Sequence, residues 1–91
     1  MSLQSENDLP TKVSQRPEYA VLARLLVEAR EKAGLSQSEL GRRLRRGQAY
    51  VWKLENAQQS PDLVELLDWA TATGSNLPVL VNEFQAIIGA A

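Results

Sequence analysis

The chain has 91 residues and a net charge of −1, with 44% hydrophobic and 23% charged residues, which allows one globular domain with a small core. It contains no cysteine and no histidine, which excludes disulfides, cysteine-ligated metals and histidine-based catalysis, so we expect no enzyme activity, metal or cofactor. No apolar run approaches the ~18 residues of a membrane span and no signal segment starts the chain, so we expect a cytoplasmic protein without a membrane partner.

The first segment of the chain is polar. Residues 1–16 carry only scattered apolar side chains, so we predict a disordered N-terminal tail ahead of one domain over residues 17–91. A solvated tail is the simpler interpretation, and an arm that contacts a polyanion through Lys12 and Arg16 is the alternative.

The next segment predicts an amphipathic helix of about 16 residues. Pro17 suits its first turn and Gly34 suits its end. Apolar residues at spacings of three and four form its inner side, which comprises Tyr19, Leu22, Leu25, Leu26, Ala29 and Ala33.

The middle of the chain predicts two short helices joined by a tight basic turn. Ser36 and Glu39 have the spacing of a capping box, in which each residue accepts a hydrogen bond from the other's backbone N–H. The first of these helices is expected over about 37–44 and the second over about 48–56. Both are too short to be stable alone, and Gly41 lets them approach closely because it has no side chain.

Two further helices complete the predicted fold. Ser60 as N-cap and Pro61 in the first turn indicate the start of one helix, and Gly74 indicates its end. We expect Trp69 at the edge of this helix and the following residues facing inward: Leu63, Leu66, Leu67 and Ala70. The last helix has an apolar side made of Leu77, Leu80, Val81, Phe84, Ile87 and Ile88. The sequence therefore predicts an all-α bundle of five helices.

The charges are separated along the chain. Residues 30–53 hold seven basic and two acidic residues, whereas residues 54–91 hold five acidic residues and no basic one. Local charge decides where a polyanion docks, so the net charge of −1 does not argue against a nucleic-acid partner.

The run Leu-Ser-Gln-Ser-Glu-Leu that begins at Leu35 is followed at regular spacing by Gly41, Leu44, Val51, Leu54 and Glu55. Together these residues resemble the helix-turn-helix of the phage-repressor and Cro type, also called the XRE type, over roughly residues 19–84. The resemblance implies a five-helix, lambda-repressor-like fold. It also implies that the helix at about 48–56 lies in the major groove of double-stranded DNA.

The predicted recognition helix turns Val51 and Leu54 inward. The residues expected to read bases are Gln48, Ala49, Tyr50 and Lys53. The resemblance implies this role for the glutamine, the alanine and the lysine. These suit adenine, a thymine methyl, and a guanine or a phosphate, respectively. Tyr50 and Trp52 are expected to point outward onto the DNA, and the alternative is that either folds back over the turn.

The basic turn is expected to contact the DNA backbone. The residues assigned to phosphate are Gln37, Arg42, Arg43, Arg45, Arg46 and Trp52. The resemblance implies this role for Gln37, and a solvated basic face is the alternative for the arginines. The turn departs from the family pattern, because Arg45 stands where glycine is usual and Arg46 where an apolar residue is usual. Gly47 stands where the family has serine, threonine or proline.

Two further contacts are expected. The resemblance implies a partly buried salt bridge between Arg30 and Glu55 that fixes the recognition helix on the first helix. The last helix is apolar on two faces, and one face suits a weak homodimer through Leu77, Val81, Phe84 and Ile88. The alternative is that this helix folds over the core of its own chain.

We therefore expect a sequence-specific DNA-binding transcriptional regulator that acts as a dimeric repressor. The alternative is an antitoxin that binds a toxin protein and also regulates its own operon, for which the acidic C-terminal half offers a surface.

Overall fold

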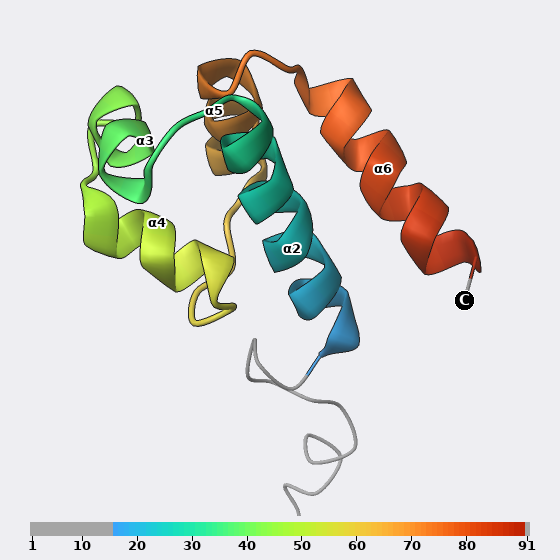
Figure 1. Cartoon of the computed structure of the whole chain (residues 1–91). Coiled ribbons are helices and arrows are strands. Elements are labelled where there is room, and N and C mark those ends of the chain that lie inside the picture. Colours follow the sequence, from blue (N-terminus) through green and yellow to red (C-terminus); the bar gives the residue numbers. More distant parts are fainter. Residues whose placement is uncertain (1–15, 91) are drawn as a thin grey trace, which may run out of the picture.

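The structure, a computed structural model, describes residues 16–90, and five α-helices account for most of that part of the chain (Figure 1). They are α2 (Pro17–Lys32), α3 (Gln37–Arg43), α4 (Gln48–Glu55), α5 (Leu63–Ala72) and α6 (Leu77–Ala90). This order confirms the predicted all-α fold. The predicted tail, with Lys12, lies outside the described residues except for Arg16, whose Nε lies 3.2 Å from Oε1 of Glu18. Within residues 16–90, every helix is too short or too polar to cross a lipid bilayer.

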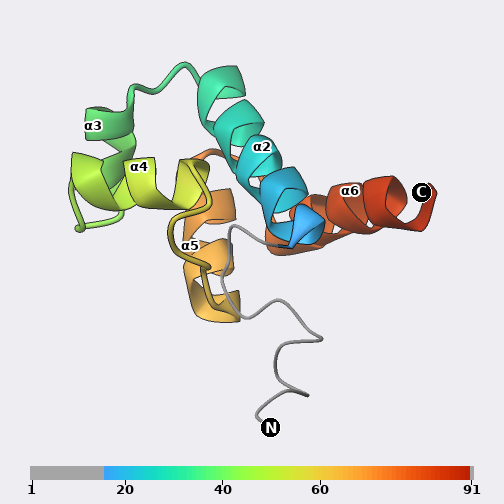
Figure 2. The same cartoon turned by 90° about the horizontal axis from the view of Figure 1, so that it is seen from below.

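The helices are arranged around α2. Helix α3 packs on α4, and α2 packs on both α4 and α6, while α5 contacts α6. In Figures 1 and 2 the α3–α4 pair and α6 lie on opposite sides of α2. The pair that contains the predicted recognition helix is therefore supported by α2 on one side of the domain.

Trp69 is the largest fully buried side chain, with 1% of its surface exposed, and its indole Nε1 donates a hydrogen bond to the Leu26 carbonyl at 3.1 Å. The expectation that Trp69 lies at the edge of its helix is wrong, as is the expectation that Leu63 and Leu67 face inward, because both leucines are exposed. Helix α5 is apolar on two faces, and burial of the face with the tryptophan removes more apolar area from water. The same core contains Leu25, Leu40, Val51, Leu54, Ala70 and Leu80.

Helix α5 begins later than expected. Its N-cap is Asp62, whose Oδ1 accepts the Glu65 N–H at 2.7 Å, while Glu65 Oε1 accepts the Asp62 N–H at 2.9 Å. The prediction of Ser60 as N-cap and Pro61 in the first turn is therefore wrong. The reciprocal bonds of this capping box satisfy two backbone donors, whereas the serine offers one acceptor.

Candidate nucleic-acid interface

The N-termini of α3 and α4 meet through two glutamine side chains. Nε2 of Gln48 donates to Oε1 of Gln37 at 2.6 Å, and Nε2 of Gln37 donates to Oε1 of Glu55 at 2.9 Å. The start of α3 is held by the expected capping box, in which the N–H of Glu39 donates to Oγ of Ser36 at 3.0 Å and the reciprocal bond is 2.8 Å long. The exposed side chain of Gln48, the first residue of α4, is thus oriented by Gln37, the first residue of α3.

The Arg30 guanidinium holds the same Glu55 carboxylate from the side of α2. Its Nε lies 2.6 Å from Oε2 and its Nη2 lies 3.1 Å from Oε1, so the pair is bidentate. A third donor, Nη1, bonds to the Leu35 carbonyl at 2.8 Å. The Glu55 side chain is only 3% exposed, and its hydrogen bonds raise the pKa of the Arg30 guanidinium. The structure therefore brings together the expected pair and connects α2, α3 and the end of α4.

The turn between α3 and α4 depends on three unusual backbone positions. A Cβ added to Gly41 would lie 2.9 Å from the backbone nitrogen of Gln48 and closer still to Gly47, so only glycine permits this approach. The Gly41 carbonyl accepts the N–H groups of Arg46 and Gly47 at 2.9 and 3.1 Å. Gly47 has φ 107°, and Arg45 has φ 58°. An arginine thus occupies the left-handed conformation that favours glycine.

The exposed face of α4 carries four of the five residues expected to point outward. Gln48, Ala49, Trp52 and Lys53 are exposed, and 46% of the Trp52 surface is accessible. Tyr50 is half-buried instead, and its hydroxyl donates a hydrogen bond to a carboxylate oxygen of α5 at 2.9 Å. Burial, together with this bond, raises the pKa of the Tyr50 hydroxyl. The expectation that Tyr50 points outward is wrong, and the alternative of a side chain folded back is the one observed.

The four arginines at the end of α3 and in the turn have different environments. Nη1 of Arg43 donates to the Ala72 carbonyl at the C-terminus of α5 at 2.9 Å. Nη1 of Arg46 lies 3.3 Å from Oε2 of Glu65, the carboxylate that accepts the Tyr50 hydroxyl. The Arg46 guanidinium lies 4.0 Å from the centre of the Tyr50 ring. Arg42 and Arg45 are exposed and take part in no side-chain hydrogen bond or ion pair within residues 16–90. They are therefore the arginines available to an external anion.

Comparison with known proteins identifies this arrangement. Residues 21–84 match a family model described as a helix-turn-helix domain. The chain is similar to an XRE-family like protein from Pseudomonas syringae pv. tomato str. DC3000, with 38% identity, a TM-score of 0.72, and coverage of 78% of this chain and 87% of that chain. The chain belongs to the XRE-type helix-turn-helix family.

A second similar structure is a hypothetical transcription factor, NHTF, from Neisseria, with 30% identity and a TM-score of 0.64. That similarity covers 79% of this chain and 84% of the other. A comparison with curated proteins gave no match. As a member of this family, the chain is a DNA-binding transcription regulator.

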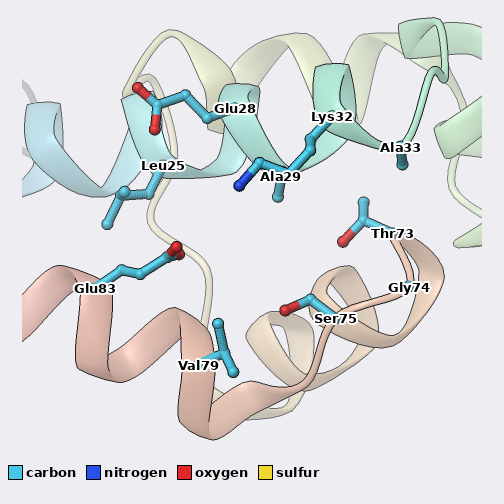
Figure 3. A pocket seen from close by; sticks show the side chains of 10 residues that line it. All are labelled: Leu25, Glu28, Ala29, Lys32, Ala33, Thr73, Gly74, Ser75, Val79 and Glu83. Atoms are coloured by element: carbon cyan, nitrogen blue, oxygen red, sulfur yellow. The ribbon is translucent and has the colours of Figure 1, made fainter.

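This XRE-type domain also contains a hollow on the α6 side of α2, away from α4. It has a volume of about 350 Å³ and lies between the C-terminal half of α2, the α5–α6 corner and the first turns of α6. Figure 3 shows the Glu83 carboxylate pointing across the hollow toward α2, with Leu25 and Val79 beside it. In the described part of the chain, no three carboxylates are grouped closely enough to hold a metal ion.

Two features of the interface were not predicted from the sequence. One is the bond between Gln48 and Gln37, and the other is the contact of Tyr50 and Arg46 with Glu65. The Asp-x-x-Glu spacing that places Glu65 at the start of α5 was a readable signal. Its contacts with residues 15 and 19 positions earlier required the packed structure.

Proposed function

We propose that the chain is a sequence-specific transcriptional repressor that reads double-stranded DNA with α4 in the major groove. The observation that carries this proposal is the 2.6 Å bond between Gln48 and Gln37, which orients an amide at the N-terminal end of α4. A glutamine amide in that position suits adenine, because it matches the N6 donor and the N7 acceptor. Ala49 and Lys53 lie exposed on the same helix and suit a thymine methyl and a guanine or phosphate.

The DNA backbone is the proposed ligand of the residues around this reader. Arg42 and Arg45 supply cations that are unpaired within residues 16–90, and Trp52 supplies an exposed aromatic side chain whose indole N–H is a donor. Gln37 contributes its main-chain N–H at the start of α3, since its side chain already binds Gln48 and Glu55. These contacts set affinity and orientation, whereas base contacts set sequence preference.

The test is selection from a random duplex library with the wild type and Gln48→Ala. We expect the variant to lose the preference at one base pair, to bind the preferred site more weakly by about 1–3 kcal/mol, and to keep its non-specific binding. Gln85→Ala is the matched control, because Gln85 is an exposed glutamine of α6. An identical selected motif for Gln48→Ala and wild type would remove Gln48 as a reader.

A homodimer through α6 is part of the proposal. Val81 is 40% exposed at an apolar hollow of about 90 Å³, and Leu77, Phe84 and Ile88 are half-buried. Phe84 packs on the core of its own chain, so Val81 is the most accessible of the four. A two-fold pair would present two recognition helices to half-sites about 34 Å apart. The acidic charge of residues 54–91 would weaken the pair by repulsion.

The second candidate function is that of an antitoxin, which would bind a toxin protein and repress its own operon. Its support is the outer face of α5, where Leu63 and Val64 are each 64% exposed and Leu67 lies beside them. Apolar side chains of this size on one helical face are typical of protein interfaces. A toxin-like reading frame next to this gene, whose product co-purifies with the chain and is released by Leu63→Glu, would favour this function over that of a simple repressor.

A further inference from the structure

Glu65 joins three parts of the chain through one carboxylate. Its Oε1 accepts the Asp62 N–H in the capping box at 2.9 Å. Its Oε2 accepts the Tyr50 hydroxyl at 2.9 Å and lies 3.3 Å from Nη1 of Arg46. The Arg46 guanidinium lies over the Tyr50 ring, 4.0 Å from its centre. The arginine next to the start of α4 is therefore held toward α5 by a carboxylate and an aromatic ring together.

This arrangement separates Arg46 from its neighbours in the basic segment. Arg42 and Arg45 make no ion pair within residues 16–90, whereas Arg46 has an acidic partner that is itself oriented by two hydrogen bonds. Nη1 of Arg46 is engaged by the carboxylate although 48% of the side chain is exposed, so a phosphate has to compete with Glu65 for this guanidinium. A guanidinium neutralised by a nearby carboxylate also attracts a polyanion less strongly.

We propose that Glu65, oriented by Tyr50, is a positioning residue that withholds Arg46 from DNA phosphates and so limits sequence-independent affinity. The inference rests on the proposed function, because it presumes that α4 binds DNA. Specificity is the difference between the affinity for the preferred site and the affinity for any other duplex. A phosphate contact common to all duplexes adds equally to both affinities, so its removal lowers binding to every duplex and leaves the discrimination by Gln48 unchanged.

The test measures the binding of a random-sequence duplex as a function of salt concentration. Glu65→Gln keeps one oxygen for the capping box, while its amide nitrogen replaces Oε2 and can donate to the Tyr50 hydroxyl, so the variant removes the charge and the acceptor that hold Arg46. We expect tighter random-sequence binding and a slope of log affinity against log salt that is steeper by ~0.9, equivalent to an additional factor of about 3.5 for a fourfold rise in salt. Arg46→Ala should leave the wild-type slope unchanged and cancel the gain in the Glu65→Gln background.

The matched control is Asp68→Asn, which removes an equal charge from an exposed residue of the same helix that forms no ion pair within residues 16–90. A steeper slope in Asp68→Asn equal to that in Glu65→Gln would overturn the proposal, because the effect would then be general electrostatics. A flatter slope for Arg46→Ala in the wild-type background would also overturn it. If thermal melting shows that Glu65→Gln is unfolded, Tyr50→Phe replaces it, because it keeps the ring and removes one bond that orients the carboxylate. Tyr50→Phe should then steepen the slope in the same direction, and an unchanged slope would overturn the proposal.

The wild type distinguishes this inference from the proposed function. A wild type that binds no duplex overturns both. A wild type that selects a motif through Gln48 while Glu65→Gln keeps the wild-type slope and random-sequence affinity overturns the role of Glu65 alone.

Discussion

Arg45 has a left-handed backbone conformation, with φ 58°, in the turn that leads into α4. For a residue with a side chain this conformation costs about 1–2 kcal/mol. Glycine removes that cost but loses about 0.5–1 kcal/mol through its more flexible unfolded state. Arg45→Gly should therefore stabilise the domain by about 0.5–1 kcal/mol, which raises the melting temperature by about 4 °C.

The same substitution should weaken DNA binding. Arg45 is an exposed cation of the proposed phosphate surface, so its loss should flatten the slope of log affinity against log salt by ~0.9 for every duplex. Both results together would mean that the arginine at this glycine-favouring position contributes to DNA binding, while its backbone conformation destabilises the domain. Arg45→Lys keeps both the charge and the backbone strain, so it should change neither the slope nor the melting temperature strongly.

Ala57 provides the matched control. It has φ 55° just after α4, where the next residue donates its N–H to the Lys53 carbonyl at 2.8 Å, so it is also a non-glycine residue in a left-handed helix end. Ala57→Gly should stabilise the domain by a similar amount and leave the salt slope unchanged, because no charge is lost. A melting temperature that rises for Ala57→Gly but not for Arg45→Gly would refute the backbone argument for Arg45. An unchanged slope in Arg45→Gly would remove its side chain from the interface.

Three further predictions concern the supports of the reading surface. Arg30→Ala and Glu55→Ala should each destabilise the domain by about 3 kcal/mol, because each leaves its partner as an uncompensated, largely buried charge. In a double-mutant cycle measured by denaturant unfolding, the two effects should be strongly coupled, and additive unfolding free energies would contradict the contact. Val81→Glu should give a folded monomer in sedimentation and weaker operator binding in a binding assay. Leu63→Glu on α5 should still dimerise, and equal effects of the two substitutions would argue against a dimer through α6. The hydrogen bond from the capping-box N–H lowers the pKa of Glu65 below its ordinary value of 4.5, so its stabilising effect is complete above that pH and is lost as the pH falls through the folded-state pKa. Glu65→Gln should therefore lose less melting temperature than the wild type as the pH falls below 4.5.

The helices and the family were determined by short-range patterns in the sequence. The capping box of Ser36 and Glu39 and the apolar spacings of three and four depend on neighbours within about one helical turn, so they can be recognised without the fold. The glycine at position 41 was also predictable, because close helix packing leaves no space for a Cβ. The resemblance to the XRE type placed Arg30 opposite Glu55, which the geometry shows as a bidentate contact.

The direction of individual side chains was decided only by tertiary packing. Both faces of α5 are apolar, and the choice of Trp69 for the core over Leu63 depended on a contact with Leu26, 43 residues away. The Tyr50 hydroxyl could donate a hydrogen bond to water or to another helix, and it donates to Glu65 because the packed structure brings this carboxylate of α5 within reach. The same carboxylate distinguishes Arg46 from Arg45, although the two are adjacent and equally basic in the sequence. Short-range signals define each helix, but the partner of an exposed or half-buried side chain depends on which distant helix packs beside it.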